Sequence, residues 1–179
     1  LRELGPWTTS LQWRYLGTTY MLLPLYRHDQ IEPSPRKARR FDYWHTDFNG
    51  HAGCFPKVSW QLRPTLILEG RALDAAAAVT RRVFYLDAQT YVPALWKIYR
   101  GDNQLWKFVI NAYAHPDSHL PDNRASGAPI PTASSTIDIA ANRCTTLQLL
   151  TLINVPDVGP ADFNASNMQH GGGANFRRR

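Results

Sequence analysis

The clearest pattern in this chain is the alternation of apolar and polar residues in its C-terminal half, which predicts β-strands rather than helices. Three consecutive strands are predicted at Arg82–Asp87, Tyr91–Arg100 and Gln104–Ala114. Turns at Ala88–Gln89 and Gly101–Asn103 are short enough to join them as hairpins. The centre of the molecule is therefore expected to be an antiparallel meander.

Further strands are expected on both sides of this meander. They are Trp13–Tyr15 and Thr19–Leu25 around a turn at Gly17, Thr65–Leu73, and a hairpin of Ser134–Ala140 with Thr145–Val155. Phe41–Lys57 shows no regular period, and Ala114–Ala133 is rich in Pro, Asp, Ser and Gly, which is typical of a long loop. A short helical turn is expected only after Asn164. The predicted fold class is mainly β with few short helices.

Two meander strands carry apolar residues on both faces. In Tyr91–Arg100 the two faces hold Tyr91, Leu95 and Tyr99 against Val92, Ala94, Trp96 and Ile98, and Gln104–Ala114 repeats the pattern. Antiparallel sheets normally keep one face in water, so a second apolar face requires a cover of protein or of hydrophobic ligand. The candidate ligand-binding residues are Trp96, Ile98, Trp106, Phe108 and Ile110. The opposite face is the alternative lining, and each aromatic residue alone is also compatible with an ordinary core.

The size of the chain predicts one domain spanning residues 1–179, large enough for a core without metal or disulfides. No run of residues approaches the roughly 18 consecutive apolar residues that a membrane-spanning helix requires. The chain begins at Leu1 without a leader, so we expect a mature form or the C-terminal part of a longer precursor.

The net charge of +6 would suit an anionic partner. The basic residues are scattered, however, over Arg36–Arg40, Arg81–Arg82 and Arg177–Arg179, and form no single stripe. Nucleic-acid binding is therefore not expected.

Candidate chemistry is sparse. His45, Asp47, His51 and Cys54 offer zinc-compatible ligand types, but their spacing fits no standard structural zinc site. Cys54 and Cys144, the two cysteines, are compatible with one disulfide or with two buried thiols. His115, Asp117 and His119 lie together after the last meander strand, where a polar loop is the simpler interpretation. We predict no catalytic site, no metal and no cofactor.

The meander also resembles a known family. Its segments Arg81–Asp87, Thr90–Tyr91 and Tyr99–Lys107 resemble the signature of a Gram-negative envelope family of unknown function, number 1329, often labelled outer membrane lipoprotein-sorting protein. Tyr91 stands where that family more often has tryptophan, and Lys107 where it has arginine. Tyr15–Pro24 and Ile137–Ile139 are also similar to the family, so the resemblance spans most of the chain.

The resemblance implies a fold like that of the periplasmic carriers LolA and LolB. In such a fold a curved antiparallel sheet forms an incomplete barrel, and its concave apolar side holds acyl chains. It also implies a periplasmic location, free or associated with the outer membrane, and at most peripheral contact with a membrane. The segment Asp29–Lys57 departs from the family, and the family's upstream part is absent here, so part of the half-barrel is expected to be missing.

These observations lead to a hypothesis of function. We expect a non-enzymatic periplasmic carrier or binding protein for a lipid, a lipoprotein acyl chain or another hydrophobic molecule. The alternative is a scaffold subunit of an envelope assembly, in which other envelope proteins cover the apolar face. A hydrolase that uses the loop from His115 to His119 is a third hypothesis.

Overall fold

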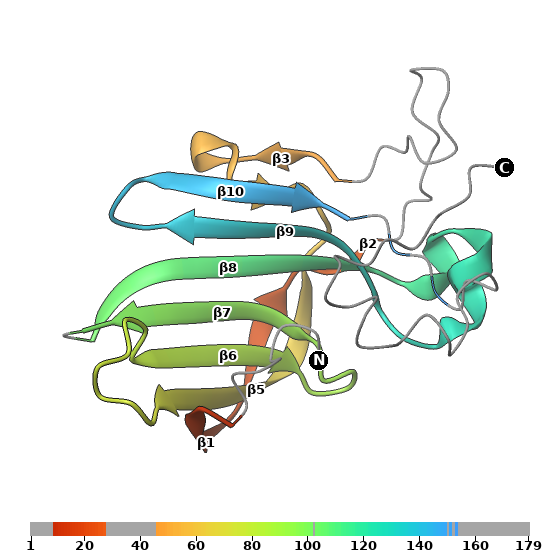
Figure 1. The fold of residues 1–179 in the computed structure, drawn as a ribbon. Coiled ribbons are helices and arrows are strands. Elements are labelled where there is room, and N and C mark those ends of the chain that lie inside the picture. The colour runs from red at the N-terminus through yellow and green to blue at the C-terminus, as the bar shows by residue number, and fades with distance from the viewer. Residues whose placement is uncertain (1–8, 28–45, 102, 150, 152, 154–179) are drawn as a thin grey trace, which may run out of the picture.

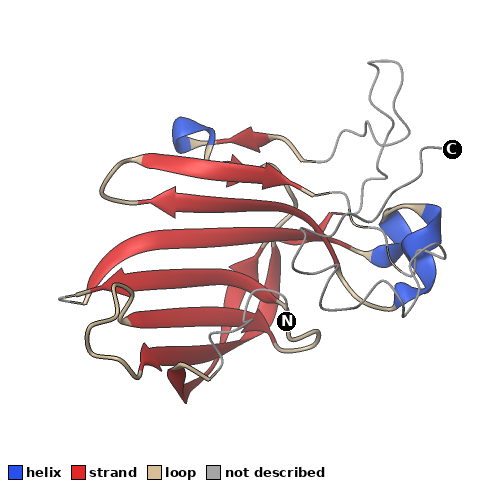
Figure 2. Cartoon of the chain, viewed as in Figure 1, coloured by secondary structure: helices blue, strands red, loops and turns tan. Residues whose placement is uncertain are grey.

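The computed structural model describes residues 9–27, 46–101, 103–149, 151 and 153. Most of them belong to one eight-stranded sheet with the strand order β1-β5-β6-β7-β8-β9-β10, in which neighbours are antiparallel (Figures 1 and 2). The strands are β1 (Leu11–Leu23), β5 (Gln61–Ala72), β6 (Arg81–Asp87), β7 (Pro93–Arg100), β8 (Gln104–Ala114), β9 (Ile130–Asp138) and β10 (Arg143–Gln148). The expected mainly β fold with a curved antiparallel sheet is confirmed, and the sheet is not closed into a barrel.

The eighth strand, β2 (Leu25–Arg27), is what covers one end of this sheet. At the end of β1 the chain stops pairing with β5 and passes Pro24. It then forms β2, which pairs in parallel with the end of β8. In Figure 1, β1 and β5 curve behind β6 and β7. We call the region where Leu23 and Leu25 pack against Leu95 and Ile110 the closed end of the sheet.

Cross-strand pairing defines the two faces of the sheet. Directly paired residues place their side chains on the same face. The inner face, which carries the closed end, is marked by the row Ile67, Tyr85, Leu95 and Ile110. The outer face is marked by the row Leu68, Phe84, Trp96 and Val109.

Both faces contain buried apolar side chains. On the inner face Leu23, Leu25 and Ile110 are fully buried, and Leu95 is nearly so. On the outer face Phe84 is buried between Trp13 and Trp96, with ring centroids 5.6 and 5.9 Å apart. The expectation that something other than this chain shields one face is therefore wrong for the closed end, which β1 and β2 cover themselves.

A small hairpin lies beside the last strand of the sheet. It consists of β3 (Phe48–Asn49), a 3-10 turn η1 (His51–Gly53) and β4 (Phe55–Pro56). A disulfide joins Cys54 to Cys144 in β10, with the Cα atoms 5.8 Å apart. Of the two states that the sequence left open for these cysteines, the structure has the disulfide.

The predicted meander agrees with the structure to within two residues at each strand end, and Gln104–Ala114 has the predicted bounds. Pro93 opens β7 next to a register shift, because proline lacks the N–H that a ladder position needs. The expected turn at Gly17 is wrong. Gly17, with φ 127°, follows a bulge inside one continuous strand, and the register shifts between Tyr15 and Gly17.

The long loop between the two hairpins is shorter than expected. Two 3-10 helices, η2 (Pro116–Ser118) and η3 (Pro121–Ser126), occupy its first part, and β9 begins at Ile130. Phe41–Lys57, for which no element was predicted, contains the β3–β4 hairpin. The helical turn expected after Asn164 lies outside the described residues.

Candidate functional site

The structure divides the five predicted ligand-binding residues between the two faces. Trp96 pairs with Val109 and Ile98 with Lys107, on the outer face. Phe108 pairs with Lys97, and Ile110 with Leu95, on the inner face. One lining built from all five residues is therefore wrong, because the register of β7 and β8 places them on opposite sides.

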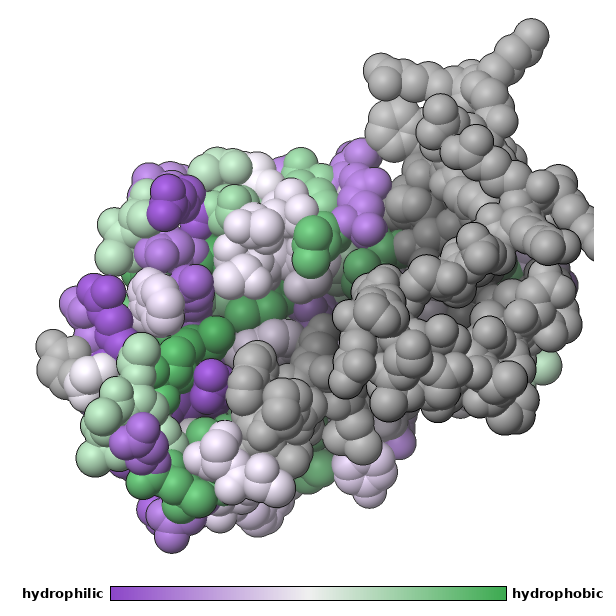
Figure 3. Space-filling view, viewed as in Figure 1, coloured by the Kyte–Doolittle hydropathy of each residue, from purple (hydrophilic) through white to green (hydrophobic). Residues whose placement is uncertain are grey.

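Trp106 belongs with the outer group. It lies at the register shift of β8, and its indole Nε1 donates a hydrogen bond to Asp138 Oδ2 at 3.1 Å. The Lys107 ammonium lies 4.1 Å from its ring centroid, which adds a cation–π contact. Figure 3, viewed from the side where β6–β10 lie in front, shows hydrophobic and hydrophilic residues mixed over the described part of this face.

The inner face continues beyond the closed end as an apolar row. Met21, Tyr85, Phe108 and Ile137 are only partly buried and pack against the closed-end cluster. Ile67, also partly buried, pairs with Tyr85 and extends the row onto β5. This row is the part of the inner face that combines apolar chemistry with accessible surface.

Charged residues replace the apolar row at the other end of the inner face. Glu69 on β5 is almost fully buried and accepts hydrogen bonds from Arg71 Nε at 2.7 Å and Arg81 Nη1 at 3.1 Å. The Arg81 guanidinium also lies 3.7 Å from the centroid of the Tyr99 ring. We call the group Glu69, Arg71, Arg81 and Tyr99 the open end, because it lies at the opposite ends of the same strands from the closed end.

The ionisation of Glu69 is favoured by its partners. The hydrogen bond from Arg71 lowers the pKa of Glu69, burial opposes this, and Arg81 lowers the pKa further. Glu69 is therefore a carboxylate at neutral pH, and it holds both guanidinium groups in place. The open end carries two guanidinium charges for one carboxylate.

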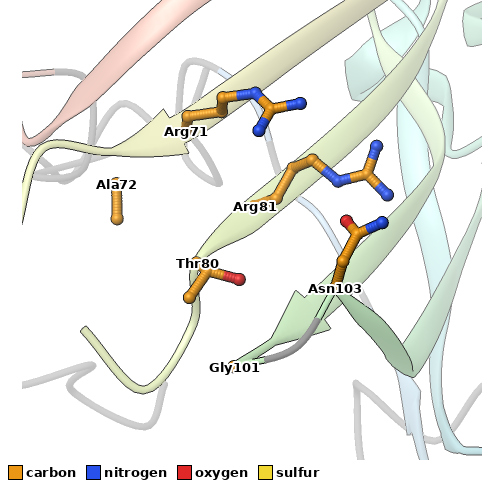
Figure 4. Close-up of a pocket in the computed structure, with 6 residues that line it drawn as sticks. All are labelled: Arg71, Ala72, Thr80, Arg81, Gly101 and Asn103. Atoms are coloured by element: carbon orange, nitrogen blue, oxygen red, sulfur yellow. The ribbon is translucent and has the colours of Figure 1, made fainter. Parts of the chain in front are cut away.

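A pocket of about 290 Å³ opens beside these arginines. Its lining comes from the strands β5 and β6, the residue before β6 and the turn between β7 and β8: Arg71, Ala72, Thr80, Arg81, Gly101 and Asn103. Figure 4 shows the Arg71 and Arg81 side chains extending in the same direction, with the Asn103 side chain directed toward Arg81. The pocket is polar and below the usual range of about 300–1,000 Å³ for drug-sized ligands, so its size suits a small polar group.

A second buried carboxylate lies beside the closed end. Asp87, fully buried, accepts hydrogen bonds from Arg63 Nε at 2.8 Å and Nη2 at 3.0 Å. It also accepts bonds from the backbone N–H and hydroxyl of Thr90, so it fixes the turn between β6 and β7. Burial raises the pKa of Asp87, but the hydrogen bonds from Arg63 and Thr90 outweigh it, and the net pKa is lowered.

Arg81, Asp87 and Thr90 lie within the segments that resemble the family, and Glu69 lies within a predicted strand, but none of them was predicted to belong to a site. The available signal was chemical. Glu69 directly follows the apolar run Leu66–Leu68, and Asp87 directly follows the apolar run Val83–Leu86. A carboxylate next to such a run usually requires a cationic partner.

The histidines of the loop after β8 have structural contacts. The His115 Nδ1 atom accepts a hydrogen bond from the Asp117 backbone N–H and so caps η2, and its ring contacts Tyr26 edge-on. His119 is buried and hydrogen-bonded to Asn123 at 2.7 Å. His115 and Asp117 are therefore accessible to solvent, whereas His119 is buried.

Of the zinc-compatible residues, His45 lies outside the described part of the chain, and Asp47 and His51 do not form a metal site with Cys54. Its sulfur is bonded to Cys144, and His51 Nε2 is hydrogen-bonded to Asn142 at 2.6 Å. Within the described residues no group of three or more His, Cys, Asp or Glu side chains could hold a metal ion. In that same part of the chain, none of the helices has the length and apolar character needed to cross a bilayer.

Two solved structures resemble this fold, both at 15% sequence identity. A putative outer membrane lipoprotein-sorting protein domain from Vibrio parahaemolyticus matches 89% of this chain with a TM-score of 0.48. This chain spans about half, 48%, of that domain. A DUF1329 family protein from Desulfovibrio piger matches 86% of this chain and 71% of its own length, with a TM-score of 0.45.

Comparison of the sequence with family models identifies the family of this chain. No curated protein matches the chain. The model of a family described as "Protein of unknown function (DUF1329)" matches residues 5–169, which is most of the sequence and includes the meander signature. The chain belongs to the DUF1329 family.

Proposed function

We propose that this protein is a non-enzymatic carrier or binding protein for a lipid, a lipoprotein acyl chain or a similar hydrophobic molecule in the periplasm. The observation that carries the proposal is the apolar row of the inner face. Ile67, Tyr85, Phe108 and Ile137 are partly accessible there, on the side toward which the sheet curves.

Burial of apolar surface against this row is sufficient to bind an acyl chain. Burial of an acyl chain contributes roughly 0.8 kcal/mol per methylene, so several methylenes against this row suffice for measurable binding without a charged contact. The row adjoins the closed-end cluster, which supplies a rigid wall of fully buried side chains.

The disulfide supports the proposed location. Cys54 and Cys144 lie 90 residues apart in sequence, and such bonds persist in oxidising compartments such as the periplasm. The name of the similar Vibrio domain, an outer membrane lipoprotein-sorting protein, fits the same compartment. Association with the outer membrane is part of this proposal.

The test is binding of a fluorescent fatty acid to two variants of the apolar row. Phe108→Ala and Ile137→Ala each remove a partly buried inner side chain, and each is expected to weaken binding by about tenfold, through lost apolar contact. Circular dichroism and thermal unfolding establish that each variant folds.

Trp106→Ala is the matched control, because Trp106 lies on the outer side with Asp138. Its affinity for the fatty acid is expected to equal that of the wild type. Loss of binding in Trp106→Ala with retention in Phe108→Ala would contradict the inner-face assignment, and absence of binding to the wild type would contradict the function.

A second candidate function, a subunit of an envelope assembly, is favoured by a different surface. Tyr20, Leu22 and Leu62 are 70%, 58% and 65% exposed, and Leu22 and Leu62 are directly paired on the outer face. Among the described strands, β1 pairs along its length with β5 alone, so its other edge offers backbone groups to a partner strand.

Photo-crosslinking in cells tests this second function. A crosslinker at Leu62 is expected to trap one recurrent envelope protein, while the same group at exposed Thr145 on β10 traps none. Equal crosslinking at both positions would contradict a partner at this surface.

A further inference from the structure

We propose that the pocket between Arg71 and Arg81 binds an anionic group, a phosphate or a carboxylate. In the carrier proposed above, on which this second step rests, the pocket holds the head group of an amphipathic anionic ligand.

The open end has an excess of positive charge. The described side chains of the open end carry two guanidinium groups and one carboxylate, Glu69, so one positive charge is not neutralised there. Lys97, on the same face, places its ammonium 5.5 Å from the centroid of the Tyr85 ring and adds a further positive charge toward the apolar row. Asp102 lies outside the described residues and is not included in this count.

Both arginines of the open end retain hydrogen-bond donors that Glu69 does not use. A guanidinium has five N–H donors. Within the described part of the chain, Arg81 uses one of its nitrogens, Nη1, for Glu69, and its buried Nε has no partner. Arg71 binds Glu69 through Nε and Nη2 and remains 59% exposed, so its outer nitrogen faces solvent. An oxyanion in the pocket would accept hydrogen bonds from the outer nitrogens of both groups.

The two guanidinium groups are also pre-organised for an anion. Glu69 forms ion pairs with both arginines, and the Arg81 guanidinium also makes a cation–π contact with the Tyr99 ring. The side chains therefore lose little conformational freedom on binding, which favours affinity. The Thr80 hydroxyl and the Asn103 amide, both in the lining, are further polar groups for a small oxyanion.

The pocket also lies within reach of the apolar row. Arg71, Arg81 and Tyr99 form one cross-strand row on the inner face, the face that also carries the apolar row. Along β6, Arg81 is four residues from Tyr85, a distance of about 13 Å at the usual rise of a strand. An alkyl chain can span that distance, so one molecule can contact both regions.

The test uses three probes by isothermal titration calorimetry: dodecyl phosphate, dodecanol and inorganic phosphate. Wild-type protein is expected to bind dodecyl phosphate at least about tenfold more tightly than dodecanol, because charge-assisted hydrogen bonds are added. Arg71→Gln is expected to remove that advantage and to leave the affinity for dodecanol unchanged.

A second variant tests the anion site independently, so that a folding defect in Arg71→Gln does not decide the result. Asn103→Asp places a negative charge at the pocket and leaves the Glu69 contacts intact; Asn103 has φ 66°, a left-handed conformation that Asp also tolerates. It is expected to weaken dodecyl phosphate binding by about tenfold. Arg143→Gln on β10 is the control for total charge and is expected to change nothing.

The outcomes separate the two proposals. If dodecanol does not bind to the wild type but inorganic phosphate binds and depends on Arg71, the anion site stands and the carrier function fails. If dodecyl phosphate and dodecanol bind equally well, or if Arg71→Gln and Asn103→Asp match the wild type, the anion site is overturned while the carrier function stands.

Discussion

The two ends of the inner face use the same chemical device with different results. At the closed end, Asp87 is matched by one guanidinium, Arg63, and its Oδ2 also accepts two hydrogen bonds from Thr90. At the open end, Glu69 is shared by two guanidinium groups, and Arg71 stays largely exposed. The charge-balanced pair Arg63–Asp87 joins β5 to β6, whereas the second arginine at the open end leaves a positive charge available for a ligand.

The apolar surroundings of the two ends differ in the same sense. Beside the closed end, Leu23, Leu25 and Ile110 are fully buried and contribute to stability. Toward the open end, the apolar side chains are only partly buried and lead to a polar pocket. Stability and binding are therefore assigned to opposite ends of one sheet, and this assignment can be tested by matched variants.

The largest difference is expected between Arg63→Gln and Arg71→Gln. Arg63→Gln leaves the buried Asp87 carboxylate without its cation and should lower the free energy of unfolding by about 3–5 kcal/mol. Arg71→Gln should lower it by less than about 1 kcal/mol, because Arg71 is exposed and Arg81 still holds Glu69. Urea denaturation measures both, and equal losses would contradict the contrast.

The next effect concerns two adjacent leucines. Leu23→Ala creates a cavity at the closed end and should lower the free energy of unfolding by about 2–5 kcal/mol. Leu22→Ala removes a side chain that is 58% exposed and should change it by less than about 0.5 kcal/mol. Chemical denaturation of the pair gives the answer, and a large loss for Leu22→Ala would show that the outer surface is core.

The smallest effect is the dependence of stability on pH. The pKa values of Asp87 and Glu69 are lowered in the folded state, so their contribution is present above the unfolded values of about 4 and is lost as the pH falls through the folded values. Asp87→Asn should flatten this acid-side loss, because it removes a carboxyl group whose pKa is lowered on folding. Unfolding free energies measured from neutral to acidic pH test this, and a variant curve parallel to the wild type would contradict it.

Much of the sheet was predictable because alternation is a local property. The strands β6 to β8 and the β9–β10 hairpin follow from apolar positions and turn residues within each segment. The extent of β1 could not be predicted in this way. Gly17 is compatible with a turn or with a bulge, and pairing with β5 decides between them. The parallel pairing of β2 with β8 is likewise a long-range contact that no local pattern encodes.

The candidate site was harder to predict for a related reason. Alternation shows which residues of one strand share a face, but it does not show how that face aligns with the next strand. Trp96 and Phe108 were therefore grouped together, although the register places them on opposite faces. The open end joins Glu69, Arg81 and Tyr99 from three strands, and only their pairing reveals that they meet.

The most direct test of a ligand on the inner face is an NMR titration with dodecyl phosphate that follows methyl groups on both sides of the sheet. We expect shifts at Ile67 and Ile137 on the inner face, and at the Arg71 and Arg81 side chains. Shifts confined to Leu22 and Leu62 on the outer face, or no shifts at all, would contradict this expectation.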